Sequence, residues 1–197
     1  MADTVPQVKS TKRERMAWYL YDFGNSAYAS VVLLAVYSAY FKNQVVGGAE
    51  GSRLWGLSIS VAMILVAIAA PIMGAIADYS GAKKKFLFFF TALSVVFTAL
   101  LFFTQKGTIA TAILFFLLSE LGYRAAQVFY DALLPEIAAP EETGRIAGTG
   151  WAIGSAGGIV ILLLILPPIL ISKSDLLVVR STLIVTAIFF ALASIPI

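Results

Sequence analysis

Six long apolar runs, separated by short polar or glycine-containing breaks, occupy most of this 197-residue chain. A helix that crosses the hydrocarbon core of a bilayer needs about 20 apolar residues. Backbone polar groups in lipid are satisfied only within helices or closed barrels, and the runs lack the period-two alternation of barrel strands. The sequence therefore predicts an all-α membrane protein with six transmembrane helices. The predicted spans are approximately residues 17–41, 54–77, 86–104, 109–130, 146–171 and 178–197.

The composition agrees with a membrane protein and narrows the functional classes. The chain is 60% hydrophobic and 13% charged, whereas a soluble domain is about 45–50% apolar and about 25% charged. It has no cysteine and no histidine, which excludes disulfides, thiol chemistry and the common zinc sites. No serine occupies a G-x-S-x-G setting. We therefore expect no enzyme, no catalytic residues, no metal and no cofactor, and the net charge of +3 does not indicate nucleic acid.

The basic residues indicate an orientation, because lysine and arginine are enriched in cytoplasmic loops. With a cytoplasmic N-terminus, eight basic residues lie inside and five lie outside or near the outer ends. We therefore expect a multi-pass protein of the bacterial inner (plasma) membrane with a cytoplasmic N-terminus. Residues 1–15 are polar and without periodicity, which predicts disorder. The inside group is Lys9, Lys12, Arg13, Arg15, Lys83, Lys84, Lys85 and Arg145, and the outside group is Lys42, Arg53, Lys106, Lys173 and Arg180.

The turn between the second and third runs, residues 74–85, reads GAIADYSGAKKK and concentrates charge. Asp78 lies at the C-terminal end of one span, and lysines open the next, so both signs oppose the local helix dipole. Such charges are more plausible if they have partners on other elements. Gly74 permits close helix contact and Gly81 a tight turn. Orientation alone remains a sufficient explanation for the lysines.

Three stretches resemble a known family. Gly74, Asp78, Gly81, Lys83 and Lys84 fit the G-x-x-x-D-x-x-G-x-[KR]-[KR] signature of the major facilitator superfamily. The stretches WYLYDFGNSAYASVV and VFYDALLPEIAAPEETGRIAGTGWAIGSAGG resemble its vacuolar amino-acid effluxer-like branch, which is associated with autophagy in fungi and widespread in bacteria. The resemblance covers most of the chain from Trp18 onward.

This resemblance implies a secondary active transporter that moves a small solute, with amino acids as the implied class, by rocker-switch alternating access. The family fold has two six-helix halves, each built from two inverted three-helix repeats. The chain matches the N-terminal half only, so we expect a truncated chain or an isolated half, with the second half absent. The motif in residues 74–85 would then be a cytoplasmic gate. The alternative is a half-size carrier or pore that works as a homodimer. The implied partners are the lipid bilayer, the solute, protons or another coupling ion, and a C-terminal half or second copy.

Ionisable residues inside the spans are candidates for a solute or coupling-ion cavity. Inserting each such residue into the bilayer costs about 2.5–3.5 kcal/mol, so these side chains usually face a cavity or a partner and not lipid. Residues spaced 4, 3 and 4 apart on the fourth span form a polar stripe roughly 60° wide. It consists of Glu120, Arg124, Gln127 and Asp131. The alternative is an ion pair that neutralises itself at i, i+4. On the first span, the Asp22 carboxylate, with Asn25 beside it, either carries a coupling proton or anchors the helix near the interface.

The fifth span is rich in glycine. Gly150, Gly154 and Gly158 are each four residues apart, and small residues at that spacing let another backbone approach closely. Static helix packing is one interpretation. A pivot along which two helix bundles slide is the other.

Overall fold

The computed structural model describes residues 10–197, apart from the side chains of residues 77, 78 and 80. Every regular element among these residues is helical, and six helices are long and apolar enough to cross a membrane. The predicted fold class and number of spans are therefore confirmed. The elements are α1 (Lys12–Tyr28), η1 (Ala29–Ala35), α2 (Tyr37–Tyr40), η2 (Phe41–Val46), α3 (Gly48–Ser80), α4 (Lys83–Leu100), η3 (Leu101–Phe103), α5 (Ile109–Ala132), α6 (Leu134–Ile137), α7 (Thr143–Ile171) and α8 (Leu176–Ser194).

The first span is a composite of α1, η1, α2 and η2, in which η1 and η2 are π-helical. It begins earlier than predicted, because Thr11 caps α1. The Thr11 hydroxyl accepts from the Glu14 amide at 3.2 Å, and the Glu14 carboxylate accepts from the Thr11 amide at 2.8 Å. This reciprocal capping box stabilises the first turn. The prediction of disorder is therefore wrong for residues 12–15, and residues 1–9 lie outside the described part of the chain.

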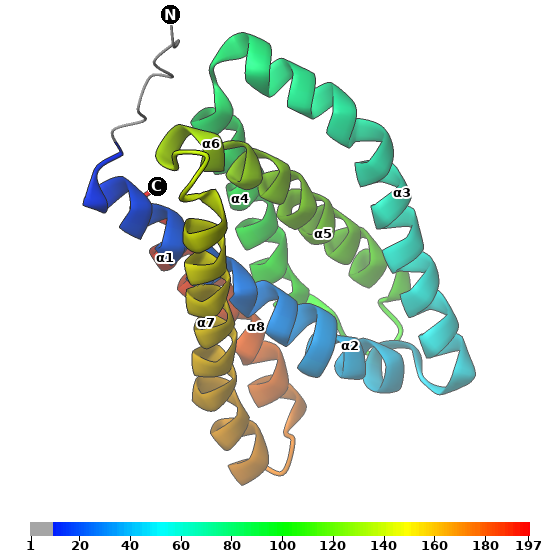
Figure 1. Ribbon diagram of the computed structural model, residues 1–197. Coiled ribbons are helices and arrows are strands. Elements are labelled where there is room, and N and C mark those ends of the chain that lie inside the picture. The colour runs from blue at the N-terminus through cyan, green and yellow to red at the C-terminus, as the bar shows by residue number, and fades with distance from the viewer. Residues whose placement is uncertain (1–9) are drawn as a thin grey trace, which may run out of the picture.

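The second and third spans are joined by a tight turn at Gly81, whose φ of 61° lies in the left-handed region. Glycine reaches that conformation without a steric penalty, as the sequence predicted. Pro71 lies inside α3 and cannot donate the usual backbone hydrogen bond. Figure 1 shows α3 bending before it reaches the turn.

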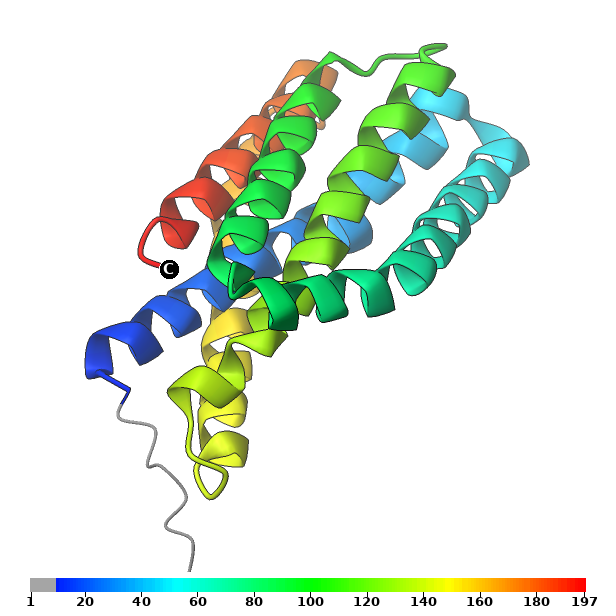
Figure 2. The same cartoon turned by 90° about the horizontal axis from the view of Figure 1, so that it is seen from above.

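The bundle is organised around α1 and α5. Helix α1 packs against α7 and α8, whereas α5 packs against α3 and α4, and α4 also contacts α8. Figure 2 shows α4 and α8 side by side at one edge of the bundle. Stacked aromatic rings join the two groups of helices: Trp18 on Tyr130 at 4.4 Å and Tyr28 on Tyr123 at 4.5 Å between ring centroids.

Within residues 10–197, basic residues of the two predicted groups lie at opposite ends of the bundle. At one end, Arg15 of α1 pairs with Glu142 at the start of α7 at 2.9 Å. At the other end, Arg180 of α8 donates to the Phe102 carbonyl at 3.5 Å. Helices α1, α4 and α7 thus begin at the same end. That this end faces the cytoplasm remains a prediction.

Candidate functional site

The Glu120–Arg124 pair is the centre of the candidate site. Glu120 lies at the midpoint of α5 and has 0% of its side chain exposed, whereas Arg124, one turn later, is 35% exposed. Nε of Arg124 donates to Oε1 of Glu120 at 2.9 Å. The guanidinium also lies over the Tyr123 ring, 5.2 Å from its centroid. The carboxylate is therefore fully enclosed while its cationic partner reaches a more open space.

Two tyrosines that the sequence reasoning missed complete this region. Tyr28 of α1 stacks on Tyr123, and its hydroxyl lies 3.0 Å from the Ser119 hydroxyl. The Ser119 hydroxyl also lies 2.9 Å from the Phe116 carbonyl, and the Tyr28 hydroxyl is within hydrogen-bonding reach of the Glu120 carboxylate as well. Tyr123 adjoins Arg124 in the sequence, but no local signal points to Tyr28, which reaches the site only through the packing of α1 on α5.

Asp22 and Asn25 lie on α1, and the Asn25 side chain is within hydrogen-bonding reach of the Asp22 carboxylate. Asn25 is 1% exposed. A methyl group added at Gly154 of α7 would overlap the Asp22 carboxylate, so Asp22 is held against α7. Asp131, at the end of the predicted stripe on α5, is the other carboxylate close enough to influence Asp22.

Three buried polar atoms in this region have no hydrogen-bond partner among the described residues: Asn25 Oδ1, Glu120 Oε2 and Tyr130 Oη. Such atoms are rare in folded proteins, because an unsatisfied buried group costs about 1–3 kcal/mol. Asn25 and Glu120 were both predicted as site residues. Gln127, the remaining predicted residue on α5, lies within hydrogen-bonding reach of Tyr123. The bundle thus keeps free acceptor capacity on α1 and α5, the two helices around which it is organised.

The glycines of α7 pack against α1. A methyl group added at Gly150 would overlap the Trp18 ring, and one at Gly158 would meet the Ser30 hydroxyl. Gly150 and Gly154 thus bring α7 close to α1, and Gly158 brings it close to η1 of the same span, which is the contact that static packing requires.

The predicted gate motif contacts two other elements, α6 and the end of α5, through Lys83. Lys83 Nζ lies 2.9 Å from Glu136 Oε1 of α6 and donates to the Ala132 carbonyl at 3.2 Å. Its side chain is 18% exposed and that of Glu136 51%. Gly74 has open space around it, so close helix contact does not explain that glycine here. The side chain of Asp78 lies outside the described residues.

Comparisons with known proteins agree with these features. The model of the family described as "Vacuole effluxer Atg22 like" matches residues 54–197. A curated relative from Bacillus subtilis (strain 168), described as "Uncharacterized MFS-type transporter YxiO", is 32% identical over 196 residues. The match covers 94% of this chain and 46% of the relative, so the chain spans about half of that protein's length. No solved structure matches the chain significantly. The chain therefore belongs to the vacuole effluxer Atg22-like family.

Proposed function

We propose that this chain forms half of a secondary active transporter, in which Asp22, Asn25, Glu120, Arg124 and Gln127 line the path of a small polar solute. The observation that carries the proposal is the enclosed Glu120–Arg124 pair, in which one carboxylate oxygen has no partner. Ionisable groups at mid-span are costly and generally face a cavity, a partner or an ion pathway. A purely structural pair would satisfy both carboxylate oxygens.

Arg124 suits a solute that carries a carboxylate, because its guanidinium presents a planar set of donors and only Nε is engaged with Glu120. An amino-acid carboxylate would compete with Glu120 for this cation. The freed Glu120 could then take up a coupling proton or bind the solute's ammonium group. Amino acids are therefore the first class of solute to test.

Alternating access by the rocker-switch mechanism requires a second bundle. Most of the apolar surface of helix α3 is uncovered, since only 6% of the residues in its most apolar 18-residue stretch are buried. This surface fits a C-terminal half or a second copy of the chain, so the homodimeric carrier or pore remains the alternative. The mass of the active particle in detergent distinguishes the two.

The gate proposal rests on the ion pair that ties the start of α4 to α6. In this proposal, Lys83 and Lys84 act with Gly74, Asp78 and Gly81 to hold one end of the path closed. Replacing Lys83 with Gln should change which end of the path a water-soluble thiol reagent reaches at an introduced cysteine. Equal labelling of the variant and the parent protein would contradict the gate.

The transport proposal is tested by counterflow of labelled amino acids in proteoliposomes containing the intact protein. We expect Glu120→Gln to abolish proton-driven accumulation but to retain exchange if Glu120 carries the coupling proton. Arg124→Lys keeps the charge but loses the planar donor set, and should raise KM for the solute. Unchanged accumulation and KM in both variants would contradict the assignment of this site.

A further inference from the structure

An apolar groove separates α4 from α8 at the edge of the bundle where the two helices lie side by side (Figure 2). Its volume is about 460 Å³. Phe88 and Val96 of α4 form one wall, and Leu192 of α8 with Ile195 just after that helix forms the other. All four side chains are exposed. Tyr21 of α1 lies at the floor and is fully buried. The groove is thus open on the outer side of helices that span a membrane.

The groove suits an apolar occupant, because the hydroxyl groups that line it already form hydrogen bonds within the protein. The Thr91 and Tyr21 hydroxyls lie 2.8 Å apart, and the Ser194 hydroxyl donates to the Phe190 carbonyl at 2.8 Å. An occupant therefore need not supply hydrogen bonds along the groove. Hydrocarbon meets this requirement, and a polar solute would leave its own groups unsatisfied.

The length of the groove corresponds to one leaflet of a bilayer. It extends along α4 from Lys84 to Val96, and twelve helical steps of 1.5 Å span about 18 Å. Half of a hydrocarbon core of about 30 Å is roughly 15 Å. An acyl chain in the groove would therefore start at the level of Lys84 and end near the bilayer midplane.

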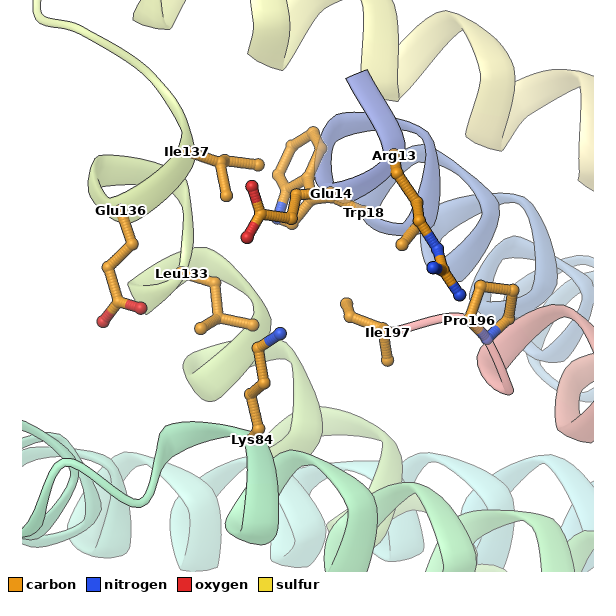
Figure 3. Close-up of a pocket in the computed structure, with 10 residues that line it drawn as sticks. Arg13, Glu14, Trp18, Lys84, Leu133, Glu136, Ile137, Pro196 and Ile197 are labelled. Atoms are coloured by element: carbon orange, nitrogen blue, oxygen red, sulfur yellow. The ribbon is translucent and has the colours of Figure 1, made fainter. Parts of the chain in front are cut away.

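A second cavity of about 240 Å³ lies at the Lys84 end and shares Lys84 and Ile197 with the groove. Figure 3 shows the Lys84 ammonium group directed from α4 into this cavity, with Arg13 of α1 on its other side. Two carboxylates also line the cavity. Glu14 accepts from the amide and hydroxyl of Thr11 and also interacts electrostatically with Lys84, whereas Glu136 pairs with Lys83.

The net charge around this cavity is positive. Arg13, Lys84 and the adjoining Lys83 carry three positive charges, against two negative charges on Glu14 and Glu136. Among the described residues, neither Arg13 nor Lys84 forms a direct ion pair or hydrogen bond, and Lys84 interacts with Glu14 only through space. A phosphate diester supplies the complementary charge and is held well by arginine and lysine. The polar cavity and the apolar groove are joined in the order in which a phosphate and an acyl chain are joined in a lipid.

We propose that this composite site holds a phospholipid from the leaflet on the Lys84 side, with its phosphate at Lys84 and Arg13 and one acyl chain in the α4–α8 groove. The proposal does not depend on the transported solute. It differs from the general contact of membrane proteins with lipid, because it names one lipid position that two cations and one groove define.

The test is native mass spectrometry of the intact protein in detergent, titrated with phosphatidylglycerol. Each basic residue at an anionic lipid contributes about fivefold in affinity, so Arg13→Gln/Lys84→Gln should raise Kd for the first bound lipid about 25-fold. Lys12→Gln/Lys85→Gln is the matched control, since it removes the same charge from the same two helices outside both cavities. Its Kd should stay within about twofold of the parent value.

The acyl chain is tested separately. Ala92→Phe places a ring in the groove and should weaken binding, whereas Ala156→Phe, at an exposed position on α7 outside both cavities, should not. Glycerol phosphate, which has no acyl chain, should fail to displace the lipid at equal concentration. Equal Kd values in the two double variants, unaltered binding in Ala92→Phe, or displacement by glycerol phosphate would each overturn the proposal.

A fluorescence measurement covers the case in which Ala92→Phe fails to fold. Ile188→Trp and Leu163→Trp place a tryptophan at exposed positions on α8 and α7, 53% and 68% exposed in the parent, and position 188 lies one turn from Leu192 without lining the groove. Phosphatidylglycerol with brominated acyl chains should quench the tryptophan at position 188 at lower lipid concentration than the one at position 163. The same quenching curve for both would overturn the assignment of the groove.

Discussion

Gly157 of α7 has the closest contact with the backbone of α1, and Gly157→Ala tests how tightly the two helices pack. The nearest atoms to an added methyl group would be the carbonyl oxygen, carbonyl carbon and Cα of Phe23, with the carbon at 2.7 Å and Cα at 2.8 Å. None of these atoms can rotate away, because all belong to the backbone of a helix. Raising the distance to Cα from 2.8 Å to an ordinary 3.4 Å requires a shift of 0.6 Å, and the oxygen requires more.

The expected cost follows from two opposing effects. Overpacking a well-packed contact typically costs about 1–3 kcal/mol, whereas Gly→Ala in a helix interior gains up to about 1 kcal/mol in helix propensity. Gly148→Ala is the matched control, because Gly148 lies on the same helix with nothing within 4 Å of an added methyl group. Since both substitutions gain the same propensity, the difference between the two variants measures the clash alone.

The assay is thermal unfolding of the intact protein in detergent, followed by tryptophan fluorescence. A chain of 150–250 residues shifts in Tm by about 2–4 °C per kcal/mol, so Gly157→Ala should melt about 2–12 °C below Gly148→Ala. Equal Tm values would refute the reasoning, because they would show that α7 can move away from α1 without loss. A pivot surface would allow that movement, so this result would favour the pivot interpretation of the glycines.

Four further predictions concern residues at one end and at the centre of the bundle. Arg124→Gln should destabilise the protein by about 3–5 kcal/mol, because it leaves the enclosed Glu120 carboxylate unpaired. Adding Glu120→Gln to this variant should recover part of the lost Tm. If the Tm losses of the two single variants simply add in the double variant, the pairing is contradicted. Thr11→Ala removes the cap of α1 and should lower the stability of that helix end by about 0.5–2 kcal/mol. Faster hydrogen exchange in residues 12–15 would show this loss. Thr108→Ala is the control, because the Thr108 side chain does not cap its helix. Lys83→Ala and Glu136→Ala should show a coupling of no more than about 1 kcal/mol in a double-mutant cycle, because Glu136 is half exposed; a larger value would show that the pair is shielded in the intact protein. Gly81→Ala should lower Tm through about 1–2 kcal/mol of backbone strain at φ 61°, whereas Gly74→Ala, in open helical surroundings, should not.

Much of the architecture is a local property of the sequence. Each apolar run is long enough to cross a bilayer by itself, so the number and type of spans could be predicted without knowing how they pack. The Glu120–Arg124 pair could be predicted for the same reason, because residues four apart on one helix face each other whatever lies beyond. The left-handed turn at Gly81 likewise depends only on its own backbone.

Contacts between helices were decided by tertiary structure alone. Tyr28 reaches the candidate site, Lys83 finds Glu136, and the glycines of α7 meet α1 only because of how these helices cross and rotate. The groove between α4 and α8 has the same origin, since its walls are 96 residues apart at Val96 and Leu192. Crossing angles and helix rotations arise from side-chain packing over the whole bundle, and no local pattern of hydrophobic and polar residues specifies them.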